Sequence, residues 1–375
     1  MVEGMEYYSE EESERLAREE AIDRDRDLKK KRRRSGGFFF VIFLIIFFAT
    51  GIIILIRYTE SDREKDMSAA ESVSEDTEGA YYTESEIEAI REEAYEEGRI
   101  SGENALKDRL RVEITEGGHS INDIVRGLYP EYMVYMEGGS YHFDPVREDV
   151  PKNRYRNLKF TVSGDGLLSY IEDGQVLSKQ VIDVSYHQGD IDWAQVKEAG
   201  VDYCMIRAGY RGYGSGAIME DECFKKNVEG AVSAGLEVGV YFYTQALNEE
   251  EAVEEAQFVM DLIAPYRITL PVAIDVEKPE ASDARGNGLD RAQRTAAVKT
   301  FCDSVAAAGY EPMIYGGTVT FAQMLEADTV KDYSVWYAFY NDYLYYPYEL
   351  KFWQYSMSGT VPGIKGKVDM SLWLP

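Results

Sequence analysis

The longest apolar run of the chain covers residues 38–56, nineteen positions without a charged side chain. A helix of that length just spans the hydrocarbon core of a bilayer. Six basic residues at 29–34 precede the run, and an acidic tract follows Arg57. By the positive-inside rule, this asymmetry predicts a cytoplasmic charged tail at 1–37 and an extracellular remainder. A cleaved signal peptide fits less well, because its leader and apolar run would both be too long and no small-residue cleavage site follows.

A second pattern begins at Val181, where short apolar runs alternate with segments of helical periodicity. The predicted strands are 181–185, 203–208, 236–243, 270–277, 311–315, 334–339, 351–355 and 367–370, and the predicted helices are 193–199, 221–234, 249–263 and 291–308. Asp192 precedes the first helix as its predicted N-cap. Alternating β and α units predict a parallel sheet, and about eight strands in this length predict an α/β barrel over 181–375. Helices become sparse after the fifth strand, so we expect an irregular last third.

Residues 57–111 join the apolar run to the rest of the chain and are predicted to be an acidic spacer followed by a helical stalk. Ile87, Ile90 and Ala94 recur at helical spacing among glutamates. A coiled coil would pair two copies of the chain through this stalk into a homodimer. The apolar repeat fails near Gly98 and Gly102, which leaves a solvated single helix as the alternative.

Residues 112–180 differ from both neighbours because tyrosines and phenylalanines alternate with turn sequences such as Gly164-Asp165-Gly166. Short aromatic strands separated by such turns are typical of a small β-rich module. The sequence assigns this module no function.

Composition excludes several classes of protein. The net charge of −28 argues against nucleic-acid binding, which needs an excess of Lys and Arg. The dense basic run beside the apolar segment is explained by topology and by anionic lipid. Three cysteines form neither a disulfide framework nor a zinc motif, so we expect no metal and no cofactor, and we expect Cys204 and Cys302 to be buried thiols.

The strongest chemical signal is the acid pair Asp275 and Glu277, at the end of the predicted strand 270–277. Their i, i+2 spacing places both carboxyls on one face of a strand, about 6–7 Å apart. The carboxyl ends of barrel strands are where α/β barrels carry their chemistry. Glycoside hydrolysis needs one protonated and one ionised acid in such a place. The alternative is a solvated strand end and a helix cap.

Two further acids belong to the same predicted mouth. Asp183 is predicted at the carboxyl end of the first strand and Asp369 at the carboxyl end of the last, and those strands are neighbours in a closed barrel. We therefore expect the two carboxyls to meet, either as part of a catalytic group or as a hydrogen-bonded pair that closes the barrel.

Aromatic and polar residues surround the predicted mouth as candidate substrate-binding groups. They are Tyr241, Tyr243, Arg207, Trp336, Tyr340, Trp353 and Gln354. Aromatic faces suit sugar rings, although each could equally belong to the core. For Arg207, a structural salt bridge is the competing role. His187 is expected on the rim.

These motifs resemble those of the family 25 glycoside hydrolases, lysozymes that cleave peptidoglycan. The resemblance rests on Asp183-Val184-Ser185 with Gln188-Gly189, on Asp275-Val276-Glu277, and on segments around Arg207, Tyr241, Trp336, Trp353 and Asp369 that follow in the family's order. It covers residues 181–375. One departure is Phe242, where many members carry a polar residue.

The resemblance implies a flattened barrel and an N-acetylmuramidase acting on the β-1,4 bond between N-acetylmuramic acid and N-acetylglucosamine. It implies that Glu277 is the general acid/base and that Asp275 orients the 2-acetamido group of the substrate as an internal nucleophile. Asp183 and Asp369 would support the site.

Together these features predict a single-pass membrane protein whose barrel faces the cell wall outside the cell and hydrolyses peptidoglycan glycan strands. The alternative is a catalytically inactive, glycan-binding barrel that acts as a cell-wall scaffold or regulator.

Overall fold

The computed structural model describes residues 82–116, 120–164, 166–279, 281 and 283–375. The chain divides after Gly98 into two compact units, and the second contains the barrel. The predicted tail at 1–37, the apolar run at 38–56 and the spacer up to residue 81 lie outside the described residues. Among the described helices, none has the length and apolar character needed to span a membrane.

The predicted stalk is helical. Helix α2 covers Glu84–Thr115 and contains only exposed or half-buried residues. Thr83 caps it, because the amide of Glu86 donates to the Thr83 hydroxyl while the Thr83 amide donates to the Glu86 carboxylate. Ile90 and Ile114 are more than half exposed. Pairing of two chains through this helix stays a prediction.

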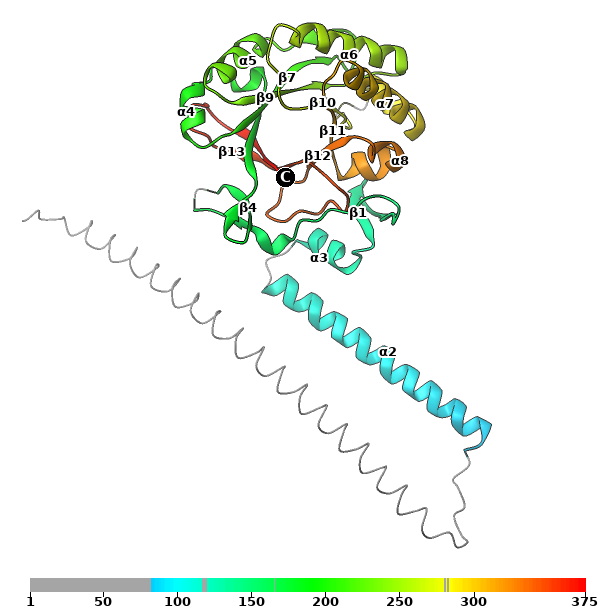
Figure 1. Ribbon diagram of the computed structural model, residues 1–375. Coiled ribbons are helices and arrows are strands. Elements are labelled where there is room, and N and C mark those ends of the chain that lie inside the picture. Colours follow the sequence, from blue (N-terminus) through cyan, green and yellow to red (C-terminus); the bar gives the residue numbers. More distant parts are fainter. Residues whose placement is uncertain (1–81, 117–119, 165, 280, 282) are drawn as a thin grey trace, which may run out of the picture. The chain divides into compact units, whose positions relative to one another are not determined.

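Eight strands close into a barrel in the order β6-β14-β13-β12-β11-β10-β9-β7, with β7 pairing back to β6 (Figure 1). Their bounds are β6 Lys179–Val184, β7 Tyr203–Arg211, β9 Glu237–Tyr243, β10 Val272–Asp275, β11 Pro312–Gly317, β12 Ser334–Ala338, β13 Phe352–Gly359 and β14 Val368–Trp373. A ninth short strand, β8 (Ile218–Glu220), forms a hairpin with β7. The predicted eight-stranded α/β barrel is confirmed.

The last strand departs from the predicted parallel arrangement. Strand β14 runs antiparallel to both β13 and β6. Asp369 therefore lies at the beginning of its strand, and the prediction that it ends a strand is wrong. Because β14 is reversed, its first residues still lie at the mouth, where Asp369 pairs in register with Asp183. The prediction that the two acids meet is confirmed, although the strand that carries Asp369 runs in the opposite direction.

Helices cover the first part of the barrel and become short afterwards, as the sequence indicates. They are α4 Trp193–Glu198, α5 Phe224–Ser233, α6 Glu249–Ile263, α7 Arg291–Ala307 and the single-turn α8 Ala327–Val330. A π-helical turn, Thr320–Met324, precedes α8. Asp192 accepts a hydrogen bond from the Gln195 amide, so its predicted role as the cap of α4 is confirmed.

Alternation along the strands separates two cores. Val181, Met205, Ala273, Met313 and Phe352 fill the barrel interior with other inward side chains. Their neighbours along each strand, such as Ile182 and Phe242, point outward into the larger core beneath the helices. The inward positions at the carboxyl ends of the parallel strands carry the polar residues of the mouth.

The segment before the barrel contains α3 (Ile121–Leu128) and two small antiparallel sheets. The first is the hairpin of β1 (Tyr132–Glu137) and β2 (Ser140–Pro145), and the second contains β3 (Phe160–Val162), β4 (Leu168–Glu172) and β5 (Gln175–Val176). Met133, Leu168 and Tyr170 belong to the same hydrophobic core as the barrel helices. We call residues 120–178 the pre-barrel segment. The predicted boundary between a module at 112–180 and a barrel at 181–375 stays a prediction.

Candidate active site

A cavity of about 330 Å³ opens at the mouth of the barrel. All four predicted acids line it, from the ends of the two parallel strands β6 and β10 and from the start of β14. The complete lining is Asp183, Arg207, Tyr241, Tyr243, Asp275, Glu277, Tyr315, Trp336, Tyr340 and Asp369. A larger cavity, about 470 Å³, lies at the opposite end, where β12 and β13 begin, and contains none of these acids. We therefore take the smaller cavity, which contains the acids, as the candidate active site.

Asp183 is buried, with a residual exposure of 6%, the same as that of Asp275. Gln354 donates from Nε2 to Asp183 Oδ2 at 2.8 Å, and Gln354 Oε1 accepts from the Tyr315 hydroxyl at 2.8 Å. Burial, followed by the charge of Asp369, raises the pKa of Asp183 well above its ordinary value. A protonated Asp183 can donate to Asp369, so the pair stays together with one negative charge.

Asp275 and Glu277 differ in exposure. Asp275 ends β10 and is buried, whereas Glu277, two residues further on, is open to solvent in the cavity. Burial raises the pKa of Asp275 well above its ordinary value, and Glu277 and Asp183 add to the rise. The pKa of Glu277 is also raised, first by lost hydration and then by the charge of Asp369. The Oδ1 atom of Asp275 accepts no hydrogen bond from the described residues, which leaves it available to a ligand.

Arg207 forms a structural salt bridge and also lines the cavity. Its Nε donates to Asp221 at 2.8 Å, and its guanidinium lies 4.9 Å from the ring centre of Tyr186. Asp221 is fully buried, so the ion pair fixes the arginine side chain. Arg207 also lines the cavity, and its charge opposes the rise in the pKa of Asp275.

Hydrogen bonds and ring packing hold the aromatic residues of the cavity in place. Trp336 donates from Nε1 to the Ser371 hydroxyl at 3.1 Å and packs edge-on against Tyr315 and Tyr241. Tyr340, with 49% exposure, forms the outer rim. Burial raises the pKa of Tyr243 and of Tyr340 to about 12, so both hydroxyls are neutral donors at physiological pH.

Two predicted substrate-binding residues lie elsewhere. Trp353 is fully buried on the outer face of β13, where its Nε1 donates to the Phe339 carbonyl and its ring meets Phe160, so the prediction that it contacts substrate is wrong. Gln354 points inward but is 1% exposed, and it donates to Asp183 and does not line the cavity. Tyr315 was missed, although it ends the predicted strand 311–315 on the inward side, a position that should have signalled it.

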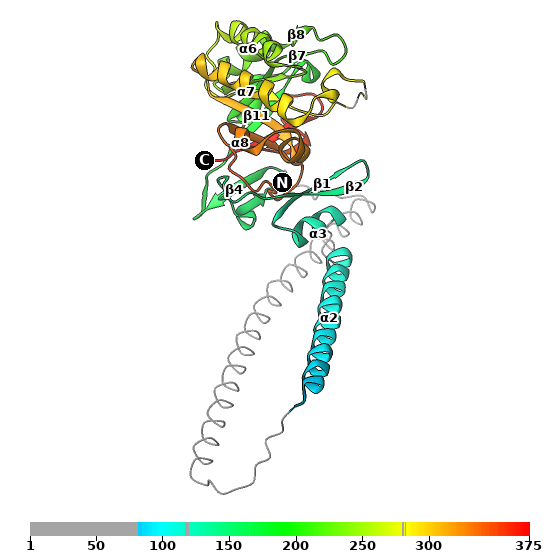
Figure 2. The same cartoon turned by 90° about the vertical axis from the view of Figure 1, so that its right-hand side faces the viewer.

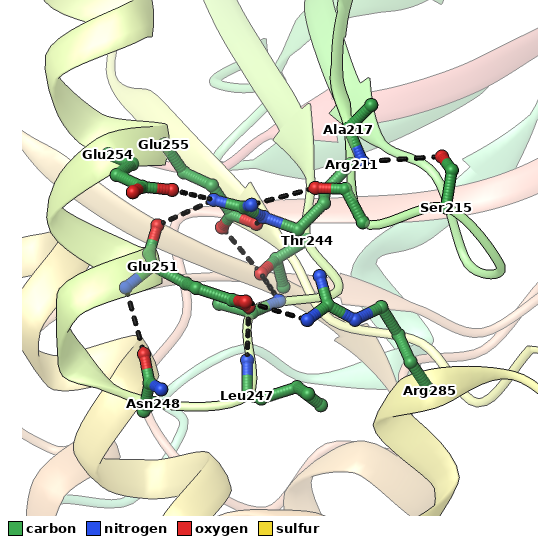
Figure 3. Close-up of polar contacts among 12 residues, drawn as sticks. Arg211, Ser215, Ala217, Thr244, Leu247, Asn248, Glu251, Glu254, Glu255 and Arg285 are labelled. Carbon is green, nitrogen blue, oxygen red and sulfur yellow. Dashed lines mark hydrogen bonds and ion pairs between the residues drawn. The ribbon is translucent and has the colours of Figure 1, made fainter.

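A buried ion network begins at Thr244, the residue after Tyr243, and includes Glu255 and Arg211 (Figure 3). Gln245 donates to the Tyr243 hydroxyl at 3.2 Å. Next to it, Thr244 donates to Glu255 at 2.6 Å, and Glu255 accepts from Arg211 Nε at 2.7 Å. The network therefore connects the end of β7 and helix α6 to Thr244, directly after the cavity-lining Tyr243 at the end of β9.

Residues 182–364 match the model of the glycosyl hydrolases family 25. The barrel of this chain belongs to that family. The membership agrees with the acid-lined mouth and with the short helices of the last third.

The autolytic lysozyme of Clostridium acetobutylicum is 31% identical over 195 residues, which are 50% of this chain and 54% of that protein. Lysozyme M1 of Streptomyces globisporus is 26% identical over 214 residues, 51% of this chain and 66% of that one. The chain thus spans between about half and two thirds of the length of these relatives.

Among solved structures, the modular autolysin LytC of Streptococcus pneumoniae matches at 25% identity with a TM-score of 0.47, over 64% of this chain and 57% of its own. The lysozyme of Streptomyces coelicolor matches at 25% identity with a TM-score of 0.42, over 52% and 91% of the two chains.

Proposed function

We propose that this protein is a membrane-anchored peptidoglycan hydrolase that cleaves the β-1,4 bond between N-acetylmuramic acid and N-acetylglucosamine. The observation that carries the proposal is the set of four carboxyls in one cavity, in which solvent-accessible Glu277 stands beside buried acids of raised pKa. Membership of a glycosidase family and similarity to two proteins named lysozymes support the same activity.

In this mechanism, Glu277 donates its proton to the glycosidic oxygen as the bond breaks. Asp275, whose Oδ1 is unpaired, accepts a hydrogen bond from the N–H of the 2-acetamido group and turns its carbonyl oxygen toward the anomeric carbon. That oxygen forms the new bond to the anomeric carbon while the leaving sugar departs. Glu277, now ionised, takes a proton from water, which attacks the anomeric carbon and reopens the acetamido ring.

Asp183 and Asp369 supply the environment of this reaction. Their shared proton keeps one negative charge near Glu277, and that charge favours the protonated form of the donor. Tyr241, Tyr243 and Tyr340 offer aromatic faces and hydroxyls to the sugar rings, and the buried Trp336 packs beneath Tyr241.

The reaction products test the activity. Purified full-length protein in detergent should release fragments from peptidoglycan whose new reducing ends are muramic acid. Reducing ends on glucosamine would contradict the bond assignment. Intact glycan that nevertheless co-sediments with the protein would replace the enzyme with the glycan-binding scaffold.

A change at Asp369 tests the electrostatic argument. Glu277 must be protonated to act, so turnover is present below its pKa and is lost as the pH rises through it. Asp369→Asn removes a charge that raises this pKa, and should move the alkaline limb of kcat to lower pH by up to about one unit. Asp190→Asn, which removes a surface carboxyl paired with Lys226, should leave the limb in place. An unmoved limb in Asp369→Asn would contradict the coupling.

The proposal places the barrel outside the cell because residues 29–34 supply six positive charges before the apolar run. Protease added to intact spheroplasts should remove an epitope attached at Pro375 and spare one at Met1. The opposite pattern would place the barrel in the cytoplasm, away from peptidoglycan, and would contradict the membrane-anchored enzyme.

A further inference from the structure

The connection between β12 and β13 carries one wall of the cavity. Residues 339–351 form it, and Tyr340 stands at its beginning, on the rim of the active site. The connection contains five further aromatic residues: Phe339, Tyr343, Tyr345, Tyr346 and Tyr348. Residues 283–375 are described without a gap, and here a loop replaces the helix that would normally cover a barrel strand. Something other than a helix must therefore hold Tyr340.

The pre-barrel segment lies along this connection, as both views of the fold show (Figures 1 and 2). Arg126 of α3 is central to the contact. Its guanidinium lies 4.9 Å from the ring centre of Phe339 and 4.9 Å from that of Tyr345. The side chain is only 16% exposed and is oriented by Asp123 at 3.3 Å and by the Val134 carbonyl at 3.3 Å. The two rings are neighbours, with centres 5.5 Å apart, and a cation that contacts both in a half-buried place is a substantial contact.

Hydrogen bonds continue the contact along the connection. The Tyr343 hydroxyl donates to Asp123 at 2.5 Å, and the Tyr345 hydroxyl accepts from the Val134 amide at 2.6 Å. Asn157 binds both backbone groups of Leu344, accepting from its N–H at 2.8 Å and donating to its C=O at 3.0 Å. The pairing of a side-chain amide with one backbone residue fixes register as well as distance.

The contacts closest to Tyr340 determine its place. Phe339 immediately precedes it and packs under Arg126, while Tyr343 follows within three residues and is bound to Asp123. From this held position, Tyr340 reaches the Tyr315 hydroxyl inside the cavity. The pre-barrel segment thus acts on the cavity through two residues that flank Tyr340.

We infer that the pre-barrel segment completes the substrate site by holding Tyr340 against the glycan strand, with Arg126 as the positioning residue. Residues 182–364, the part that matches the family, do not include this segment. The inference rests on the proposed function, since Tyr340 is taken to contact a sugar ring. It also assigns a role to a region whose sequence indicates none.

A double-mutant cycle tests the inference on the full-length protein in detergent, with soluble, uncross-linked peptidoglycan glycan strands as substrate. Arg126→Ala should raise KM about threefold to tenfold and leave kcat within about twofold, because binding geometry is lost while the acids are untouched. Tyr340→Ala should raise KM at least as much. In the Tyr340→Ala background, Arg126→Ala should add less than about twofold.

Arg154→Ala is the matched control. Arg154 also stacks on a tyrosine of the pre-barrel segment, Tyr155, but lies at the opposite end of the barrel, beside the 470 Å³ cavity. Its KM should equal that of the wild type. Thermal melting of each variant shows whether a change in KM accompanies general unfolding.

Several results would overturn the inference while the wild type still releases muramic acid ends. They are an unchanged KM in folded Arg126→Ala, an unchanged KM in Tyr340→Ala, or equal effects of Arg126→Ala in both backgrounds. If Arg126→Ala does not fold, Tyr343→Phe takes its place, since it removes one hydroxyl and should raise KM only when Tyr340 is present. A wild type that releases no muramic acid ends would instead contradict the proposed function.

Discussion

Glu277→Gln should lower turnover on peptidoglycan by about two to four decades while the protein still folds and binds glycan. Glutamine keeps the size and the hydrogen-bonding atoms of the side chain but cannot give up a proton to the glycosidic oxygen. Because Glu277 is exposed in the cavity and outside the hydrophobic core, its replacement should leave the melting temperature nearly unchanged. The measurements are the rate of release of reducing ends and co-sedimentation with insoluble peptidoglycan.

Asp275→Asn provides the companion measurement. The amide can no longer accept from the acetamido N–H through both oxygens, so turnover should also fall steeply while binding persists. Glu237→Gln, at the exposed first residue of β9, is the control carboxyl and should retain activity. Near-normal hydrolysis by Glu277→Gln would contradict its role as the proton donor, whatever the behaviour of Asp275→Asn.

The location of the acids could be predicted because it depends on local pattern. An apolar run followed by acids at i and i+2 indicates a buried strand with a polar end, and four such acids meet when the sheet closes. The cap of α4 could be predicted for the same reason, because Asp192 directly precedes a segment of helical apolar periodicity. These features require only the neighbouring residues for their interpretation.

The direction of β14 and the face of Trp353 could not be predicted in the same way. Strands buried on both faces carry apolar residues at every position, so the sequence lacks the period of two that would identify the inward side. Trp353 and Gln354 are adjacent and both looked suited to substrate, yet only Gln354 points inward. A short strand also shows the same composition in either direction, which concealed the antiparallel β14.

The contacts of the pre-barrel segment with the barrel could not be predicted from the sequence either. Arg126 meets Phe339 and Tyr345 across more than two hundred residues, and no local pattern specifies such a contact. The aromatic composition of the pre-barrel segment predicted its strands correctly. The side chains that hold the β12–β13 connection can be identified only from the folded structure.

Replacement of Arg211, at the end of β7, should have a large effect on the free energy of unfolding, because its side chain is 4% exposed and donates four hydrogen bonds. Its acceptors are Glu255 at 2.7 Å, the Gly216 carbonyl at 2.8 Å, the Glu251 carbonyl at 2.9 Å and Glu254 at 3.1 Å (Figure 3). Glu255 is fully buried, so removing the arginine would leave a carboxyl with Thr244 as its remaining side-chain donor. Two backbone carbonyls would lose a donor at the same time.

Arg211→Met, which keeps the length of the side chain without its charge, should lower the free energy of unfolding by about 3 kcal/mol near neutral pH. The loss should grow with pH. Burial already raises the pKa of Glu255 to about 7, and Arg211 opposes that rise, so its removal raises the pKa further. A folded-state pKa above the unfolded value gives stability that is lost as the pH rises, so the deficit should be larger at about pH 8 than at about pH 5.

Glu254→Gln, at the 63% exposed partner of the same arginine, should lower the free energy of unfolding by less than about 0.5 kcal/mol. Denaturant unfolding of the three proteins at both pH values measures this, and equal deficits at the two pH values would show that Arg211 does not stabilise the ionised form of Glu255.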